Sequence, residues 1–544
     1  MGASSSTEQK EVSPEQREVE AQAASTGALP MLHKAFSRLA DPQEKAIPVQ
    51  SLQKCFSLSC RSPILEPPGI SMPESILGLL GHLGHSIVDL FFVPGNGGLR
   101  WVEFVRGYVN CCGRMAASAC LNNLLRVFKF AAERVGLAAN LWFDSDGAES
   151  KVAGYLVPSD LYALLLMCSS MCWSTRMNGA SKSDKGAVFY VPDIENLVCS
   201  AVVSCAEGGG NLDPWNCDIF SLEARLPAGK FLTWVLGTVP RLPDCFSQFV
   251  SATLQCSVAS EDEFGPSGSS SKDSNSEWAS ETHLLTRGKA WAISLTFRAA
   301  ASEEILRHCF SCNSNEMNQN LLYRSSIHGK GLNRFWANVD GYHGPLLILI
   351  SASCEDSHHG DTSGKKWTIG VILQQGFENK DQFYGNSGNL YSIDPVFNVF
   401  LPSGKENNFV YSHLHPSGRV YEPRPKPVGI AFGGSIGNER VFVDQDFARV
   451  TIRHHAVDKT YKPGPLFPNQ GFLPVDDSIL EVEVWGLGGT TAKKVQTSYK
   501  KREELFTEQR RKVDLKTFAS WEDSPEKMMM DMVSDPNTVR REDR

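Results

Sequence analysis

The sequence predicts an α+β protein in which an all-helical N-terminal domain is followed by a two-sheet β-sandwich with short helices. Two observations carry this prediction. Between residues 29 and 256, apolar side chains recur every three and four positions, which is the spacing of a helix with one buried face. After residue 283, short runs of β-branched and aromatic residues alternate with glycine and proline turns, which is typical of a sandwich.

The composition is that of a folded protein. The 544 residues predict two or three domains at the usual size of ~150 residues. Hydrophobic residues make up 42% of the chain, which is enough for sizeable cores. The formal net charge of −8 argues against a nucleic-acid partner. The 15 cysteines have no repeated spacing, which indicates free thiols in a reducing compartment.

Residues 1–28 are expected to be a disordered N-terminal segment, because serine, glutamate, glutamine and alanine dominate it. Its start, Gly2-Ala3-Ser4-Ser5-Ser6, fits the N-myristoylation pattern, in which the acyl chain joins the α-amine of Gly2. The alternative is an ordinary polar tail that happens to begin with glycine. A single myristoyl chain gives only marginal, reversible membrane binding.

Residues 29–256 are expected to form the helical domain. The helical spacing is clearest in residues 76–83, 121–128 and 161–168. The strongly apolar run of residues 161–173 is shorter than the about 20 residues that a bilayer requires, so it predicts a buried core helix.

One stretch of this domain resembles part of a calcium-binding loop. Asp144-Ser145-Asp146-Gly147 is similar to a piece of an EF-hand loop. If the two aspartates take the third and fifth loop positions, the twelfth falls on Ala153, where a bidentate glutamate is needed. A degenerate, metal-free EF-hand-like region is therefore predicted, with a working calcium site as the alternative.

Residues 257–282 are rich in serine, glycine and acidic residues, which predicts a flexible linker. The domain expected next spans residues 283–489. Its strands are predicted at residues 346–350, 367–373, 396–400, 441–443 and 480–487. In the last run, apolar residues at 480, 482 and 484 alternate with Glu481, Glu483 and Trp485, so the apolar row is expected to face the core.

Three stretches of this domain resemble the TLDc domain family, which carries an L-Y-x-S-x-x-H-G element, an F-G-G element and a closing E-V-W strand. The residues that match are Tyr323, Ser325, Ser326, His328, Gly329, Phe432, Gly433, Gly434, Glu483, Trp485 and Gly486. Gly433-Gly434 also marks a turn or a close backbone approach. The chain departs from the family at Gly331, Ser435 and Ile436, where small hydroxyl residues or further glycines are usual. The resemblance implies the two-sheet sandwich.

Catalysis is an alternative that the same residues raise. His328 with Ser325 or Ser326 suggests a nucleophile and base, with Glu481 or Glu483 to orient the histidine. Neither serine lies in a G-x-S-x-G nucleophile elbow, so no catalytic residue is predicted. Glu483 is expected either on an exposed strand face or as a buried carboxylate that accepts hydrogen bonds from backbone N–H groups.

Metal and redox sites have candidates but no favoured one. Cys309 and Cys312 form an isolated CxxC, and a zinc site requires a second pair. The metal-capable side chains of one loop are Cys354, His358, His359 and Asp361. This loop separates two predicted strands, so a solvated hairpin turn is favoured over a metal site. His454-His455 is interpreted in the same way, and no metal or cofactor is predicted.

Residues 490–544 are predicted to form a basic helical tail followed by disordered residues. Between Lys493 and Lys516, nine lysines and arginines face four acidic residues with few apolar ones, which predicts a solvated helix. The alternatives to a helix without a partner are docking to a protein, contact with anionic lipid, and nuclear import. The residues expected to contact a partner are Lys500, Lys501, Arg502, Arg510, Arg511 and Lys512.

Residues 230–240 resemble the segment that precedes the domain in the lysosomal, myristoylated branch of the TLDc family. The resemblance implies a non-enzymatic cytoplasmic regulator that docks on the peripheral sector of the vacuolar-type proton ATPase at a lysosomal or vacuolar membrane. It also implies links to oxidative-stress resistance and nutrient signalling. The alternatives are a hydrolase or redox enzyme that uses His328 and Glu483 or Cys309 and Cys312, and a nuclear or nucleolar protein.

Overall fold

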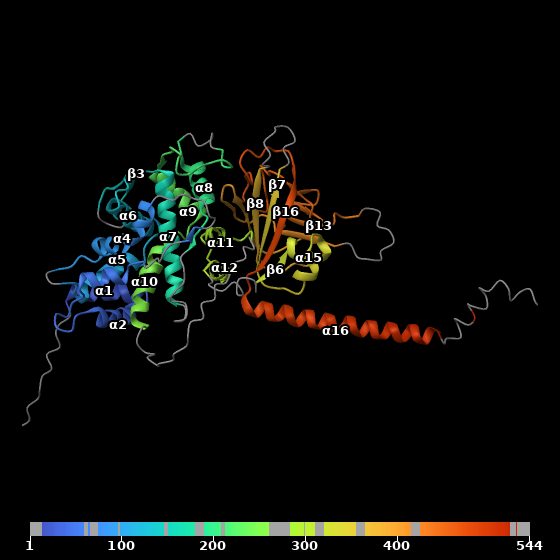
Figure 1. The fold of residues 1–544 in the computed structure, drawn as a ribbon, viewed down its shortest axis with the longest axis horizontal. Coiled ribbons are helices and arrows are strands. Elements are labelled where there is room, and N and C mark those ends of the chain that lie inside the picture. The colour runs from blue at the N-terminus through green and yellow to red at the C-terminus, as the bar shows by residue number, and fades with distance from the viewer. Residues whose placement is uncertain are drawn as a thin grey trace, which may run out of the picture.

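The computed structural model describes residues 13–58, 64–65, 74–95, 98–145, 151–179, 190–207, 213–259, 283–298, 300–310, 320–354, 365–414, 425–522 and 529. In this part of the chain, a helical half packs beside a β-rich half, and one long helix extends away from the body (Figure 1). The predicted α+β class is confirmed. Gly2 and residues 260–282 of the predicted linker lie outside the described residues.

The helical half is built on the predicted periodic runs. Its helices are α1 (Pro14–Ser25), α2 (Leu29–Leu39), α3 (Val49–Cys55), α4 (Glu74–Phe91), α5 (Trp101–Cys112), α6 (Ala117–Arg134), α7 (Pro158–Gly179), α8 (Glu195–Cys205), α9 (Ala228–Thr238) and α10 (Asp244–Ala259). In α7 the residues from Leu161 to Met171 are at most 1% exposed, which confirms the predicted core helix. Among the described residues, no helix combines the length and apolar character needed to cross a membrane.

This half also contains short strands, so the prediction that it is all-helical is wrong in detail. Strand β1 (Ile64–Leu65) pairs in parallel with β4 (Tyr190–Val191). The other short strands are β2 (Leu141–Phe143), β3 (Val152–Leu156) and β5 (Leu226–Pro227), which form one antiparallel sheet. Aromatic and β-branched residues in β2 and β3 favour this extended conformation over a continued helix.

The β-rich half begins with two helices, α11 (Arg287–Ser294) and α12 (Ala300–Phe310), and adds α14 (Ser325–His328) and α15 (Leu332–Val339) after its first strand. Its strands are β6 (Leu321–Arg324), β7 (Leu346–Ser353), β8 (Lys366–Leu373), β9 (Lys380–Tyr384), β10 (Gly388–Asp394), β11 (Asn398–Phe400), β12 (Val410–His413), β13 (Gly429–Ser435), β14 (Asn438–Asp444), β15 (Arg449–Ile452) and β16 (Val475–Gly486). Every stretch predicted as a strand contributes to one of these strands, although the run at 396–400 contributes only its last three residues and the run at 480–487 ends one residue earlier, at Gly486.

The strands form one antiparallel sheet rather than the two predicted sheets. Its order is β11-β10-β8-β7-β16-β15-β14-β13-β12-β9, and β6 also pairs with β16. Strand β16 connects the two groups of strands in this order, the group from β11 to β7 and the group from β15 to β9. Its first residues pair with β15, and its later residues pair with β7 and β6. The expected sandwich is therefore a single sheet that curls around a core.

Strand β16 contains an irregularity that sequence alternation cannot reveal. The register with β7 shifts between Ile479 and Glu481, which leaves Leu480 in a bulge and 44% exposed. The prediction that Leu480 lies in the inner apolar row is wrong for this reason, since a bulge adds a residue and changes the face that follows. Val482 and Val484 are buried as predicted.

Two hydrophobic cores meet at the sheet. One lies inside the curl and includes Ile348 and Ile350 of β7. The other contains Leu347 and Leu349, which point from the opposite face of β7 and share a cluster with Trp291 of α11 and most helices of the N-terminal half. The helical half is thus packed against the outer face of the sheet through α11, which Figure 1 places between them.

Candidate functional site

The first and last motif elements lie side by side in the sheet. Strand β6 runs antiparallel to β16, with Arg324 opposite Glu483 and Tyr323 opposite Val484. The short helix α14 follows β6 directly and contacts β16. The serines and the histidine of one motif are therefore next to the glutamates of the other.

The carboxylate of Glu483 is completely buried and accepts three hydrogen bonds. The backbone N–H groups of Leu284 and Leu285 donate at 2.9 and 3.3 Å, and Nε1 of Trp485 donates at 3.0 Å. Arg324 Nε and His283 Nδ1 each lie 3.5 Å from Oε1. The prediction of a buried carboxylate held by backbone donors is confirmed, and the alternative of an exposed strand face is wrong.

This carboxylate fixes the chain that enters the β-rich half. His283, Leu284 and Leu285 lead directly into α11, which packs on the helical half. The ring of His283 also meets the indole of Trp485 edge-on, with centroids 5.4 Å apart. Glu483 and Trp485 thus bind the connecting chain to the last strand, and we call these residues (283–285, 483 and 485) the carboxylate clamp.

A second carboxylate, Glu481, holds α14. The hydroxyl of Ser325 donates to Oε1 of Glu481 and accepts from the N–H of Val482 at 3.0 Å. The N–H of Ser326 donates to the same oxygen at 2.9 Å. Burial by itself raises the pKa of Glu481, but the hydrogen bonds from Ser325 and Ser326, with the charge of Arg324, outweigh burial and lower this pKa.

His328 is bound to the backbone of its own motif. Its Nδ1 accepts the N–H of Arg324 at 2.9 Å, and its ring stacks on Tyr323 with centroids 5.8 Å apart. The hydroxyl of Tyr323 donates to the carbonyl oxygen of Gly329 at 2.8 Å. The proposed Ser–His pair is therefore not formed in this structure, because the Ser325 hydroxyl donates to Glu481 and His328 Nδ1 faces the backbone. His328 and Glu483 likewise hold different segments.

The glycines of the motifs serve close packing. Gly434 has φ +86°, and a Cβ on it would lie 2.2 Å from the carbonyl oxygen of Asn438. Gly433, with φ +69°, lies against the ring of Tyr461. Phe432 is fully buried in the core inside the curl. At the last residue of β16, a Cβ on Gly486 would lie 2.7 Å from the ring of Tyr342. Both glycines lie in strand β13 and the turn follows at residues 436–437, so the predicted close backbone approach is confirmed at Gly434 and the alternative of a turn at the pair is wrong.

The C-terminal helix α16 (Gly489–Glu522) is anchored at its start and free of the body afterwards (Figure 1). Gln496 Nε2 donates to the Asn338 carbonyl at 2.9 Å, and Tyr499 donates to Asp340 at 3.1 Å. Lys500, predicted as a partner contact, also donates to the Asn338 carbonyl at 2.9 Å, and burial lowers its pKa. Lys500 therefore belongs to the anchor.

The remaining predicted contacts of the tail are exposed. They are Lys501, Arg502, Arg510, Arg511 and Lys512. Leu505 and Phe506 between them are 51% and 60% exposed, so this part of α16 buries little apolar surface. The predicted solvated helix is confirmed. We call residues 501–512 the projecting segment, and at a rise of 1.5 Å per residue it is roughly 18 Å long.

The calcium candidate lies in a β-hairpin. Asp144 accepts the N–H of Lys151 at 2.7 Å, and Ala153 pairs with Trp142 across β2 and β3. Asp146 lies outside the described residues. The EF-hand-like character of this region stays a prediction.

The other metal and redox candidates are only partly described. Cys309 is in α12 and Cys354 follows β7, whereas Cys312, His358, His359 and Asp361 lie outside the described residues. His454 stacks on Phe472 with centroids 4.5 Å apart, and His455 Nδ1 lies 3.7 Å from Asp458. Within the described ranges, no three His, Cys, Asp or Glu side chains are grouped to hold a metal ion.

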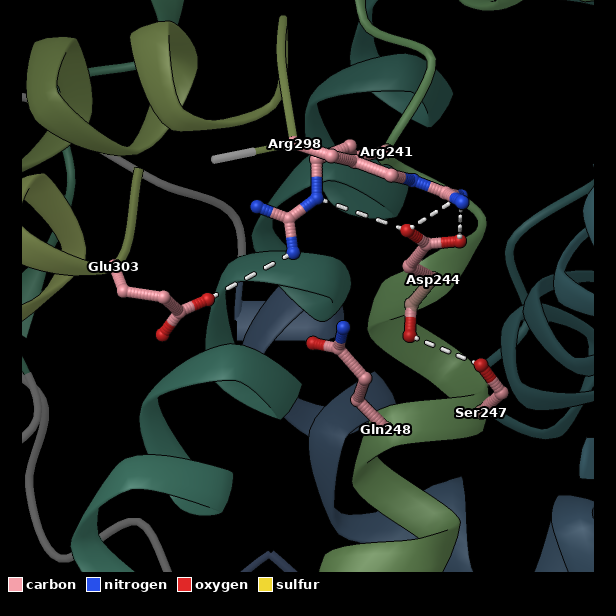
Figure 2. A pocket seen from close by; sticks show the side chains of 6 residues that line it. All are labelled: Arg241, Asp244, Ser247, Gln248, Arg298 and Glu303. Carbon is pink, nitrogen blue, oxygen red and sulfur yellow. Dashed lines mark hydrogen bonds and ion pairs between the residues drawn. The ribbon is translucent and has the colours of Figure 1, made fainter. Parts of the chain in front are cut away.

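One surface hollow has no counterpart in the sequence predictions. Arg241, Asp244, Ser247, Gln248, Arg298 and Glu303 line it (Figure 2). Arg298 donates two hydrogen bonds to Asp244, at 3.0 and 2.9 Å, and Arg241 lies between Asp244 and Glu303. The hollow lies where α10 meets the chain around α11 and α12. Its residues come from separate segments without a motif, so no local signal in the sequence marks it.

Comparison with protein families finds a match in the β-rich half. Residues 300–488 match the TLDc domain, and the three motif elements all lie within these residues. This match confirms the resemblance seen in the sequence. No curated protein matches the chain.

Replacing Glu483 by glutamine tests the carboxylate clamp. An amide has a single acceptor oxygen and no charge, so we expect a loss of about 2 kcal/mol in stability, typical of a buried group left without a partner. Hydrogen exchange of the Leu284 and Leu285 amides, followed by mass spectrometry, should accelerate. Glu503→Gln, on the exposed part of α16, is the matched control. Unchanged exchange in Glu483→Gln would contradict the clamp.

Ser325→Ala tests the hydrogen bonds to Glu481 through pH. Because the pKa of Glu481 is lowered on folding, its stabilisation is present above its ordinary pKa of 4.5 and is lost as the pH falls through the lowered value. The variant should therefore be less stable than wild type near neutral pH, and this difference should narrow below pH 4.5. Urea unfolding near neutral pH and below pH 4.5 measures the free energy of unfolding of variant and wild type, with Ser498→Ala as the control. A difference that widens in acid would refute the assignment.

Proposed function

We propose that this chain, whose residues 300–488 are a TLDc domain, is a non-enzymatic regulator that docks on the peripheral sector of the vacuolar-type proton ATPase. A TLDc domain indicates a regulatory role connected with oxidative stress. The proposed place of action is the cytoplasmic face of an endolysosomal or vacuolar membrane, with nutrient signalling as a further connection.

The observation that carries the docking proposal is the projecting segment. Five exposed lysines and arginines lie on a helix that leaves the body of the protein, and a helix of this kind reaches an acidic groove or face on a partner (Figure 1). The anchor made by Gln496, Tyr499 and Lys500 fixes the direction in which this helix leaves. The body then presents the helix at a defined angle, which reduces the entropic cost of binding.

The roles of the motif residues support a non-enzymatic function. Ser325 and Glu481 hold α14, and Glu483 holds the chain before α11. His328 is occupied by the backbone of Arg324. Each of these side chains is engaged in a contact that holds the fold, so the Ser–His pair on which the hydrolase alternative was based is not formed.

A membrane anchor would strengthen the docking. Gly2 lies outside the described residues, and its acylation rests on the sequence pattern alone. A myristoyl chain and a basic helix are each weak contacts, but together they raise the effective concentration of the protein at a membrane-bound assembly. The tail could instead direct the protein to the nucleus or nucleolus, as a second candidate based on its charge.

Charge reversal tests the projecting segment. Changing Lys501, Arg502, Arg510, Arg511 and Lys512 to glutamate should lower the recovery of proton-pump subunits from a membrane fraction by about tenfold or more, a loss of at least ~1.4 kcal/mol. The matched control reverses Lys366, Lys380, Lys405, Arg449 and Lys459, which are exposed on strands and loops of the β-rich half and change the net charge equally. If both variants recover the same amount of pump subunits, the projecting segment does not contact the partner. If the wild-type protein recovers no proton-pump subunits in gentle detergent, the proposal that the proton ATPase is the partner is contradicted.

Gly2→Ala tests the anchor. With a fluorescent protein fused to the C-terminus, wild type should show a membrane pool that the variant lacks, because alanine provides no acceptor for the myristoyl group. Ser4→Ala keeps the acceptor glycine and is the control. An identical distribution of wild type and Gly2→Ala would exclude acylation as the anchor, and a nuclear signal for all three proteins would favour the nuclear candidate.

A further inference from the structure

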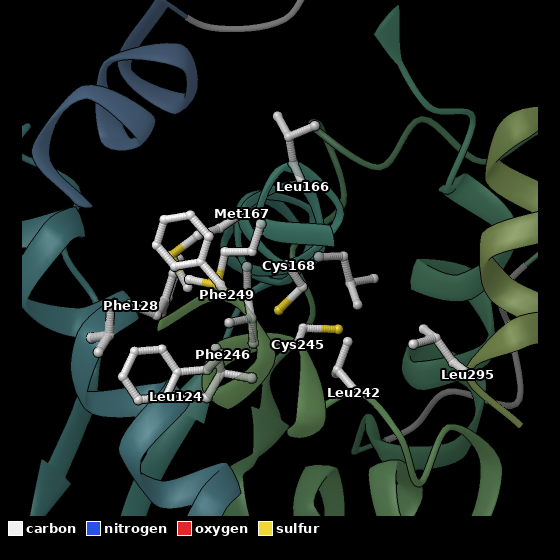
Figure 3. Close-up of a cluster of buried hydrophobic side chains, with 14 of the residues drawn as sticks. Leu124, Phe128, Leu166, Met167, Cys168, Leu242, Cys245, Phe246, Phe249 and Leu295 are labelled. Carbon is white, nitrogen blue, oxygen red and sulfur yellow. The ribbon is translucent and has the colours of Figure 1, made fainter. Parts of the chain in front are cut away.

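Two free cysteines of the helical half lie in contact. Cys172 on α7 and Cys245 on α10 have their sulfur atoms 3.3 Å apart and share a hydrogen bond. Helices α7 and α10 pack along each other, so both backbones hold this contact. Cys168, one turn before Cys172, belongs to the same buried cluster, and Figure 3 shows its sulfur beside that of Cys245.

The two sulfur atoms are close enough to form a disulfide bond after a small movement. A disulfide has a sulfur–sulfur distance of about 2.05 Å, so the two atoms would need to approach by roughly 1.3 Å. Rotation of the two side chains can supply such a shift. The other described free cysteines are buried or partly buried, and Cys172 and Cys245 are a pair whose geometry already approaches a cross-link.

The two thiols differ in a way that assigns them separate roles. Cys172 is partly exposed, whereas Cys245 is 3% exposed. The hydrogen bond with Cys245, helped by the Trp291 indole and the charges of Arg176 and Arg241, lowers the pKa of Cys172 against the effect of burial. The same hydrogen bond, together with burial, raises the pKa of Cys245. These directions favour the thiolate on Cys172, the more exposed cysteine of the pair.

We propose that Cys172 and Cys245 are a redox-active pair that a hydroperoxide converts to a disulfide between α7 and α10. The Cys172 thiolate attacks one oxygen of hydrogen peroxide, which breaks the O–O bond, gives a sulfenic acid and releases hydroxide. The Cys245 sulfur then attacks the Cys172 sulfur, forms the S–S bond and displaces the hydroxyl group. With the two thiol protons, both oxygens of the peroxide leave as water.

The pair lies next to the junction between the two halves of the protein. Arg241, one turn before Cys245, donates its N–H to the Leu295 carbonyl at 3.1 Å and its guanidinium to Ser302 at 2.6 Å. Arg176, one turn after Cys172, is paired with Glu303 of α12. Arg241 and Glu303, the partner of Arg176, both line the hollow of Figure 2. A disulfide between Cys172 and Cys245 would therefore form one turn away from Arg176 and Arg241, the two side chains that connect α7 and α10 to α12. This site is independent of the proposed docking function.

Peptide mapping of the full-length protein tests the proposal. The folded protein is treated with hydrogen peroxide, then unfolded in denaturant while its remaining free thiols are blocked with N-ethylmaleimide, and digested without reductant. We expect a Cys172–Cys245 linked peptide that disappears with dithiothreitol, while Cys205 of α8, buried and 1% exposed, is recovered as the blocked thiol. Recovery of Cys172 and Cys245 as blocked thiols, or linkage of Cys245 to Cys168 with Cys172 free, would overturn the pair.

A variant separates the two steps. In Cys245→Ser the second thiol is missing, so the sulfenic acid on Cys172 should persist and react with dimedone far more than in wild type. Cys205→Ala is the control and should behave as wild type, and far-UV circular dichroism verifies that both variants fold. Dimedone labelling of Cys172 that does not rise in folded Cys245→Ser would show that Cys245 does not resolve the sulfenic acid.

Discussion

The structure depends on a carboxylate that has no contact with water. Glu483 sits in the last strand, and its charge is tolerable there because three N–H groups donate to it and Arg324 lies nearby. Two of those donors belong to the chain that enters α11. The carboxylate therefore connects the end of the β-rich half to its beginning, and α11 carries that connection to the helical half.

The consequence is a body in which the two halves share a core. The outer face of β7 and β16 contributes Leu347, Leu349 and Trp485 to the same apolar cluster as Trp291 and the N-terminal helices. Beyond its first turns, α16 is the part of the described chain that stands apart from this body (Figure 1). A rigid body that presents one basic helix is suited to docking, whereas the motif residues maintain the body.

Much of this could be predicted from the sequence, and the failures have identifiable causes. Apolar runs predicted the strands, and charge predicted the solvated helix, because both follow from local composition. The exposure of Leu480 was not predictable, since alternation assumes a regular pleat and a bulge breaks it. The burial of Lys500 depends on α15, which lies more than 150 residues earlier. Contacts across such distances in sequence, including those of Glu483 and of the hollow, appear only when the chain has folded.

Differential scanning calorimetry of the whole protein tests the central claim most directly. If the clamp and the shared core make the helical and β-rich halves one unit, they should unfold together in one cooperative transition. Two separated transitions, one for each half, would contradict this account, because a core that spans both halves cannot survive the unfolding of either.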